Sequence, residues 1–176
     1  KDEKYRELQG TYPVIFLSFA EIKTKKFEAA REQICFQIVK LYNENEYLYD
    51  SGILTENEKK FFRSVDMDMS DVILSTAINQ MCCFMQKYYG KKVIVLLDEY
   101  DTPMQESYIN GYWEELVAVT RSMFNSTFKT NPYLERAIMT GITRVSKESI
   151  FSDLNNLVVI TTTSNQYETA FGFTEK

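Results

Sequence analysis

A short apolar run followed at once by acidic residues constrains the fold most strongly. Residues 92–97 read Lys-Val-Ile-Val-Leu-Leu, and no polar residue interrupts the run between the lysine and Asp98. A β-branched and leucine-rich run without polar alternation is typical of a strand that is buried on both faces of a parallel sheet. We therefore predict a buried strand of a parallel sheet over residues 92–97, with Asp98 at its carboxyl end.

Three weaker runs, at residues 13–19, 136–140 and 157–162, predict further strands. The apolar spacing between them predicts helices over residues 27 to about 49 and about 112 to 128. A capping box at residues 55–58 opens a short helix, and another runs from caps at Ser70 and Asp71 to Gly90. Strands that alternate with helices favour right-handed crossovers, so we predict an α/β domain with a mostly parallel sheet flanked by helices on both faces.

Composition narrows the classes of function. The chain has 176 residues, of which 44% are hydrophobic and 26% charged, as expected for one globular domain. A net charge of -5 argues against direct binding of nucleic acid. The sequence has no histidine, which excludes Ser-His-Asp triads, His-ligated zinc and histidine general bases.

Neither a membrane partner nor a thiol site is indicated. The longest apolar runs are far shorter than the roughly 20 residues that span a bilayer, so we predict a soluble, cytoplasmic protein. The three cysteines, Cys35, Cys82 and Cys83, have apolar neighbours and no CxxC spacing. Buried, chemically inert thiols are the simpler interpretation.

The acids after the central strand are the candidate site, because ligands of open α/β sheets bind at the carboxyl ends of strands. Asp98, Glu99 and Asp101 lie within four residues there. Asp98 is a candidate to hold Mg²⁺ through its water shell, and Glu99 to orient and deprotonate an attacking water. Asp101 is a second candidate for cofactor binding. Alternatively, these acids cap the strand or the following helix.

The next strand candidate ends in Thr140-Gly141-Ile142-Thr143-Arg144, at what is expected to be the same sheet edge. Thr140 supplies a hydroxyl there, and Arg144 is a candidate to stabilise phosphate charge. The alternative is that Arg144 pairs structurally with Asp98 or Asp101.

A phosphate-gripping glycine loop is absent from the sequence. The two closest glycines are Gly90 and Gly111, so neither a GxxxxGK loop nor a GxGxxG turn occurs. The chain therefore lacks the backbone cradle that usually holds nucleotide phosphates.

Four segments together carry a resemblance to a known family. They are Tyr-Pro-Val-Ile-Phe-Leu-Ser-Phe at residues 12–19, Leu-Asp-Glu-Tyr-Asp-Thr-Pro at 97–103, and Thr-Gly-Ile-Thr-Arg at 140–144 with Ser-Ile-Phe-Ser at 149–152. The sequence resembles the bacterial AAA-ATPase-like family, which implies a P-loop NTPase core that uses ATP and Mg²⁺. By this resemblance Asp98 and Glu99 match the Walker B pair, while Thr140 and Arg144 fall in the sensor region.

The same resemblance implies what surrounds this chain. Family members often carry a predicted restriction-type nuclease domain after the ATPase domain, and residues 171–175 resemble the junction. The family's first strand and P-loop lysine should precede Tyr12, where only eleven residues stand. We therefore expect residues 1–176 to be a single truncated domain that is inactive alone. The missing strand should leave a gap, so that the strands close up, strand 157–162 moves, or another chain fills it.

Two other functions remain open. A non-catalytic interaction domain would use the acidic strand end and the 14% aromatic residues to bind a protein partner, and oligomerisation is also open. A metal site of Asp98, Glu99 and Asp101 acting directly on nucleic acid is the third possibility. No lysine follows these acids at the short spacing of a restriction-type nuclease.

Overall fold

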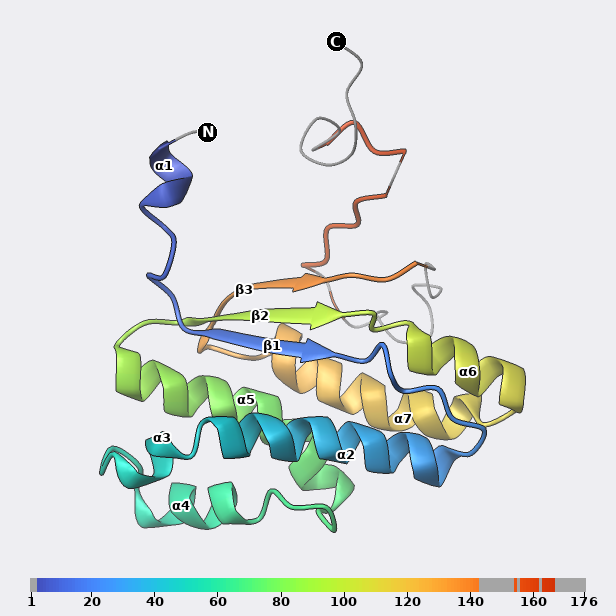
Figure 1. Cartoon of the computed structure of the whole chain (residues 1–176), viewed down its shortest axis with the longest axis horizontal. Helices are drawn as coiled ribbons and strands as arrows, with labels where there is room; N and C mark the ends of the chain where they lie inside the picture. The colour runs from blue at the N-terminus through green and yellow to red at the C-terminus, as the bar shows by residue number, and fades with distance from the viewer. Residues whose placement is uncertain (1–2, 143–153, 155, 162, 167–176) are drawn as a thin grey trace.

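The structure is a computed structural model that describes residues 3–142, 154, 156–161 and 163–166. Its sheet contains β1 (Val14–Ser18), β2 (Val93–Asp98) and β3 (Leu134–Met139), all parallel and in the order β1-β2-β3 (Figure 1). The predicted α/β class and the predicted strand that ends at Asp98 are confirmed, and this strand, β2, lies between the other two. The predicted strand at 157–162 is wrong over its described residues, 157–161, which belong to no strand.

Helices fill the connections between the strands. Between β1 and β2 lie α2 (Phe27–Glu44), α3 (Tyr47–Asp50), α4 (Glu56–Arg63) and α5 (Asp71–Tyr89). Between β2 and β3 lie α6 (Thr102–Asn110), α7 (Trp113–Phe124) and the π-helical turn η1 (Asn125–Lys129). The short helix α1 (Glu3–Arg6) precedes β1.

Two predicted helices have different bounds from those expected. The helix predicted to reach about residue 49 ends at Glu44, because the Asn45 side chain donates a hydrogen bond to the Leu41 carbonyl (2.8 Å). A side chain that bonds the backbone in this way competes with continued α-helix. The helix predicted to reach residue 128 is α-helical only to Phe124 and then widens into η1. The sequence patterns did not predict α6.

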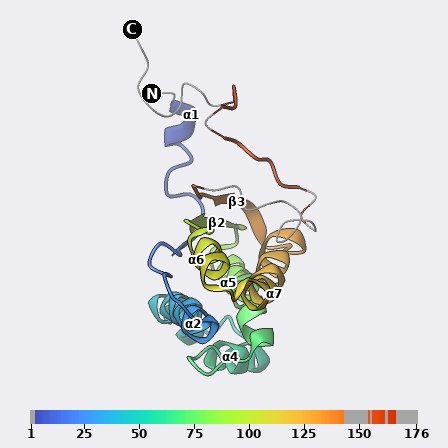
Figure 2. The ribbon, with the colours of Figure 1, turned by 90° about the vertical axis from the view of Figure 1, so that its right-hand side faces the viewer.

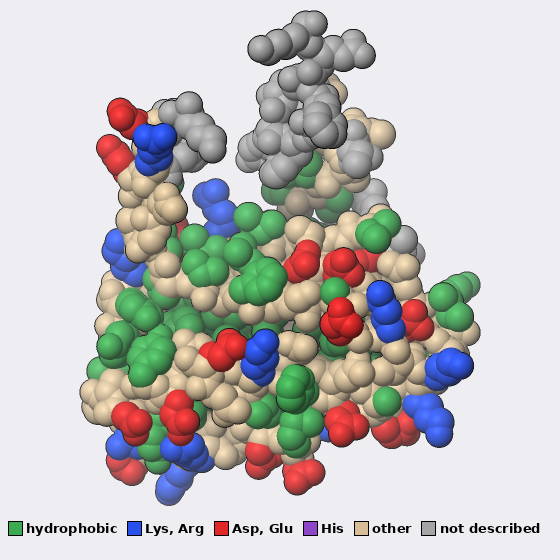
Figure 3. Space-filling model, viewed as in Figure 1, with side chains coloured by type: hydrophobic (Ala, Val, Ile, Leu, Met, Phe, Trp, Pro, Cys, Tyr) green, Lys and Arg blue, Asp and Glu red, His purple; other side chains and the backbone are tan. Residues whose placement is uncertain are grey.

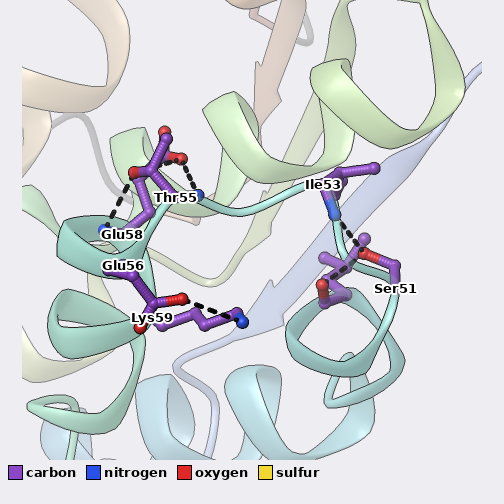
Figure 4. Close-up of polar contacts among 7 residues, drawn as sticks. Ser51, Ile53, Thr55, Glu56, Glu58 and Lys59 are labelled. Atoms are coloured by element: carbon purple, nitrogen blue, oxygen red, sulfur yellow. Dashed lines mark hydrogen bonds and ion pairs between the residues drawn. The ribbon is translucent and has the colours of Figure 1, made fainter.

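The caps predicted at Ser70, at Gly90 and at residues 55–58 are confirmed, whereas Asp71 is the first residue of α5 and not its cap. The Ser70 hydroxyl accepts from the Ile73 amide, and Gly90 ends α5 in the left-handed conformation with φ 66°. At α4 the Thr55 hydroxyl accepts from the Glu58 amide (3.3 Å), while the Glu58 carboxylate accepts from the Thr55 amide (2.8 Å) (Figure 4). Glu58 also pairs with Lys87 of α5, which ties the start of α4 to the core helix.

We expect Thr55→Ala to lower the free energy of unfolding by about 1 kcal/mol, because it leaves the Glu58 amide at the start of α4 without its acceptor. Urea denaturation measures the change. Thr55→Ser keeps the hydroxyl and serves as the control, with an expected loss well below that of alanine. Equal losses for the two variants would contradict the role of the cap.

All of the long helices lie on one side of the sheet (Figures 1 and 2). The connection from β1 to β2 and the connection from β2 to β3 step in the same direction across the sheet. Right-handed connections that step in one direction place their helices on the same face of the sheet. The resulting core is centred on α5, where Phe84 is fully buried and lies 6.0 Å from Phe62 between ring centroids. Tyr42 of α2 joins it and donates a hydrogen bond to the Ala77 carbonyl (2.8 Å).

The cysteines belong to this core, as predicted. Cys35, Cys82 and Cys83 are buried and form no disulfide. Burial raises the pKa of Cys82 to about 12 and also raises the pKa of Cys35. Because the thiolate is the reactive form, these two groups are poor nucleophiles at neutral pH.

The opposite face of the sheet has no helical layer among the described residues, contrary to the expectation of helices on both faces. Val14 is 47% exposed, Phe16 61% and Ile138 53%. Strand register places Phe16, Leu96 and Ile138 in one row across this face. Hydrophobic side chains accordingly gather on the surface around β1 (Figure 3). Parallel sheets are normally buried on both faces, so this apolar face is unusual for the fold.

Within the part of the chain that the structure describes, no helix is long and apolar enough to cross a bilayer.

Candidate functional site

The carboxyl edge of the sheet brings polar residues of all three strands together. Ser18 at the end of β1 pairs in register with Asp98 at the end of β2. The Thr140 amide, directly after β3, donates to the Leu97 carbonyl (2.9 Å), while the Phe19 amide donates to the Asp98 carbonyl (2.9 Å). These main-chain bonds fix the position of Asp98 from both sides.

The structure joins two of the predicted site residues by a direct hydrogen bond. The Thr140 hydroxyl donates to Oδ1 of Asp98 across 42 positions of sequence. The same hydroxyl oxygen accepts from the Glu99 amide (3.3 Å). The Thr140 hydroxyl therefore contacts both acids of the predicted pair: the side chain of Asp98 and the backbone of Glu99.

Glu99 has an unusual backbone conformation. Its φ is +50°, and it is the one non-glycine residue with positive φ in the described part of the chain. The left-handed region costs a non-glycine residue on the order of 1–2 kcal/mol. Such conformations persist where the surroundings fix them, and they concentrate at functional sites. Here the conformation turns the chain between the end of β2 and the start of α6.

The Glu99 side chain is held by a residue that sequence reasoning missed. The Thr102 hydroxyl donates to Oε2 of Glu99 (3.0 Å), and the Thr102 amide donates to the Glu99 carbonyl (3.2 Å). Thr102 is the first residue of α6 and precedes Pro103. A Thr-Pro pair is a helix-start signal, because proline is favoured in the first turn, and it would have located this donor in the sequence.

Asp101 lies apart from the other two acids. It is 1% exposed, and its Oδ2 accepts from Gln105 Nε2 (2.9 Å) within the first turn of α6. Gly141 packs against it so closely that a Cβ there would lie 2.6 Å from Oδ1 of Asp101. The glycine thus permits the strand end and the helix start to approach each other. This geometry favours a structural role for Asp101 over the predicted cofactor contact.

Two predictions about the site remain, the role of Arg144 and a metal site formed by the three acids. Arg144 lies outside the described residues. In the described ranges no three acidic, cysteine or histidine side chains converge as a metal site, so Asp98, Glu99 and Asp101 do not form a three-carboxylate centre. Asp98, with the Thr140 hydroxyl beside it, still presents the oxygen ligands that suit Mg²⁺, as a single carboxylate that needs water or phosphate to complete the coordination.

Comparison with known families decides the relationship of the chain. The family model described as "Predicted AAA-ATPase" matches residues 1–151, and this range includes the whole sheet and both acids. The chain belongs to the predicted AAA-ATPase family. The family inferred from the four sequence segments is thereby confirmed.

The chain is also similar to one curated protein over a shorter range. An uncharacterised protein encoded in the vnfD 5′ region of Azotobacter chroococcum mcd 1 is 32% identical over 87 residues. The match covers 49% of this chain and 17% of that protein. The aligned part is thus about a sixth of the relative's length. No solved structure gives a significant match to the chain.

Proposed function

We propose that this AAA-ATPase-like chain carries the residues that hydrolyse ATP in an ATP-dependent bacterial protein, at the carboxyl edge of its sheet. The observation that supports this most directly is the arrangement at the end of β2. Asp98 is fixed by Thr140, and Glu99 is turned out of the strand in a strained conformation held by two hydroxyl groups. The family is expected to use ATP. Ligands of open α/β sheets bind at the carboxyl ends of the strands, which is where this site lies, so its position agrees with that expectation.

Each residue has a defined task in the proposed reaction. Asp98 would hold Mg²⁺, which supplies charge neutralisation at the β- and γ-phosphates. Glu99 would accept a hydrogen bond from the attacking water and take its proton. Thr140 keeps the Asp98 carboxylate in place, and Arg144 remains the candidate that contacts phosphate.

We further propose that the chain does not bind ATP alone. Its glycine spacing excludes a phosphate-binding loop, and hydrolysis depends on positioning the phosphates against the Mg²⁺ ligand. Among the described residues no strand pairs with the outer edge of β3, which supports a larger sheet in the complete protein, and the apolar face around Phe16 supports a further layer that covers it. The missing loop and strand would come from another part of the polypeptide. A following nuclease domain, a cytoplasmic location and oligomerisation remain proposals of the same kind.

Calorimetry with Mg²⁺-ATP tests this proposal. We expect no binding to the 176-residue chain and binding in the micromolar to millimolar range to the natural full-length polypeptide, the usual range for substrates. The Thr55→Ser variant of the full-length protein should bind as the wild type does. Binding to the short chain would contradict the need for an external loop, and absence of binding to both would remove the ATPase proposal.

A non-catalytic interaction domain is the second candidate, and exposed aromatic residues favour it. Phe16 is 61% exposed, Phe36 55% and Tyr108 76%. Aromatic residues are enriched in the cores of protein interfaces. This candidate would become the better account if the full-length protein failed to bind nucleotide and Phe16→Ser weakened a partner complex.

A further inference from the structure

We infer that Thr102 is the positioning residue that sets where the Glu99 carboxylate lies, an inference that rests on the proposed hydrolytic role of Glu99. The bond from the Thr102 hydroxyl to Oε2 of Glu99 is 3.0 Å, and it spans only three positions of sequence. The main-chain bond between the same two residues is 3.2 Å. Two bonds therefore close one tight turn between β2 and α6.

Thr102 is itself well anchored. Pro103 follows it and fixes the backbone of the first helical turn through its ring. Pro103 and Met104 are both buried, and Met104 is 0% exposed. The hydroxyl donor therefore stands on a helix end that is packed into the core, which is the kind of support that holds a reactive group in place.

The arrangement gives each acid of the pair its own hydroxyl partner. Oδ1 of Asp98 accepts from Thr140 on the β3 side, and Oε2 of Glu99 accepts from Thr102 on the α6 side. Because the two donors stand on different elements, the two carboxylates are held by separate supports. One oxygen of Glu99 is engaged by Thr102, and the other is the acceptor for the attacking water.

A glutamate side chain has several rotatable bonds and adopts many conformations when nothing restrains it. A misplacement of about 1 Å can reduce the rate of a positioned reaction by about 100-fold. Loss of the Thr102 hydroxyl is therefore expected to slow the chemical step, while ATP affinity, which depends on phosphate contacts elsewhere, stays the same.

Steady-state ATP hydrolysis by the full-length polypeptide tests the inference. Thr102→Val removes the hydroxyl and nearly preserves side-chain shape, and we expect kcat to fall by about 10- to 100-fold with KM within about twofold of the wild type. Thr102→Ser restores the donor and should restore most of kcat. Thr76→Val on α5, far from the site in sequence and bonded only to its own helix, is the control and should leave both constants unchanged.

A double-mutant cycle separates positioning from a general structural effect. In the Glu99→Gln background, Thr102→Val should cause little further loss of kcat, because both changes act on one group. Full additivity, or an unchanged kcat in Thr102→Val, would overturn the inference. If Thr102→Val does not fold, Thr102→Ala tests the same bond. A wild-type rate in Glu99→Gln alone would instead refute the proposed function, so the two failures are distinguishable.

Discussion

Glu99→Gln in the full-length protein is expected to reduce kcat for ATP hydrolysis by about 10²- to 10⁴-fold, the usual contribution of general acid-base catalysis. The amide keeps the shape of the side chain and accepts a bond from Thr102, but it cannot take a proton from water. Binding of Mg²⁺-ATP should persist, because Glu99 is not among the residues expected to hold the metal or the phosphates. Phosphate release measured under saturating ATP gives the rate.

Glu106→Gln is the matched control for this prediction. Glu106 lies on α6, and its Oε2 accepts a hydrogen bond from Asn110 Nδ2 (3.3 Å). The same chemical change there should leave kcat within about twofold of the wild type. A Glu99→Gln enzyme that hydrolyses ATP at the wild-type rate would remove Glu99 from the reaction.

Phe84→Ala is expected to lower the free energy of unfolding by about 3–5 kcal/mol. Phe84 is fully buried on α5 and packs with Phe62, which in turn lies 4.8 Å from Tyr42 between ring centroids. Removing the ring leaves a cavity where three helices meet, and the loss is a large share of the 5–15 kcal/mol that stabilises most domains. Urea denaturation followed by circular dichroism measures it.

Val72→Ala provides the comparison on the same helix. Val72 is 74% exposed, so its substitution should change the free energy of unfolding by no more than about 0.5 kcal/mol. A loss below about 1 kcal/mol for Phe84→Ala would contradict the position of α5 at the centre of the core.

Sequence patterns correctly predicted the three strands that pair with one another in the described sheet. The prediction of a fourth strand, which has no such partner, failed. Residues 92–97 carry their own burial signal, and the strands predicted at 13–19 and 136–140 are present as β1 and β3. Residues 157–161 have the same β-branched character, yet they form no strand, and Val158 is 71% exposed. Strand propensity depends on a neighbouring strand and a surface to pack against, which a local pattern does not report.

The end of α2 and the start of α6 also could not be predicted from local apolar patterns. At Asn45 a side-chain bond to the Leu41 carbonyl ends a helix whose apolar spacing continues beyond it. In α6 the apolar pattern is weak, and the informative signal was the single Thr-Pro pair at residues 102 and 103. The end of α2 and the start of α6 both depend on individual hydrogen bonds and caps. The periodicity of apolar residues shows only which face of a helix is buried.

The candidate site was predictable in position but not in detail. Parallel strands place their carboxyl ends together, so the approach of Thr140 to Asp98 followed from the fold class. The separate support of Glu99 by Thr102 and the burial of Asp101 against Gly141 required coordinates. Three acids that are adjacent in sequence thus have three different surroundings.

We propose that Asp98 and Glu99 at the carboxyl edge of the sheet complete an ATP site together with residues outside this chain. Calorimetric titration of Mg²⁺-ATP into Glu99→Gln full-length protein, beside the same variant of the 176-residue chain, tests it most directly. We expect the full-length variant to bind Mg²⁺-ATP without the hydrolysis heat of the wild type, and we expect no binding to the short chain. Equal binding to both forms, or no binding to either, would contradict it.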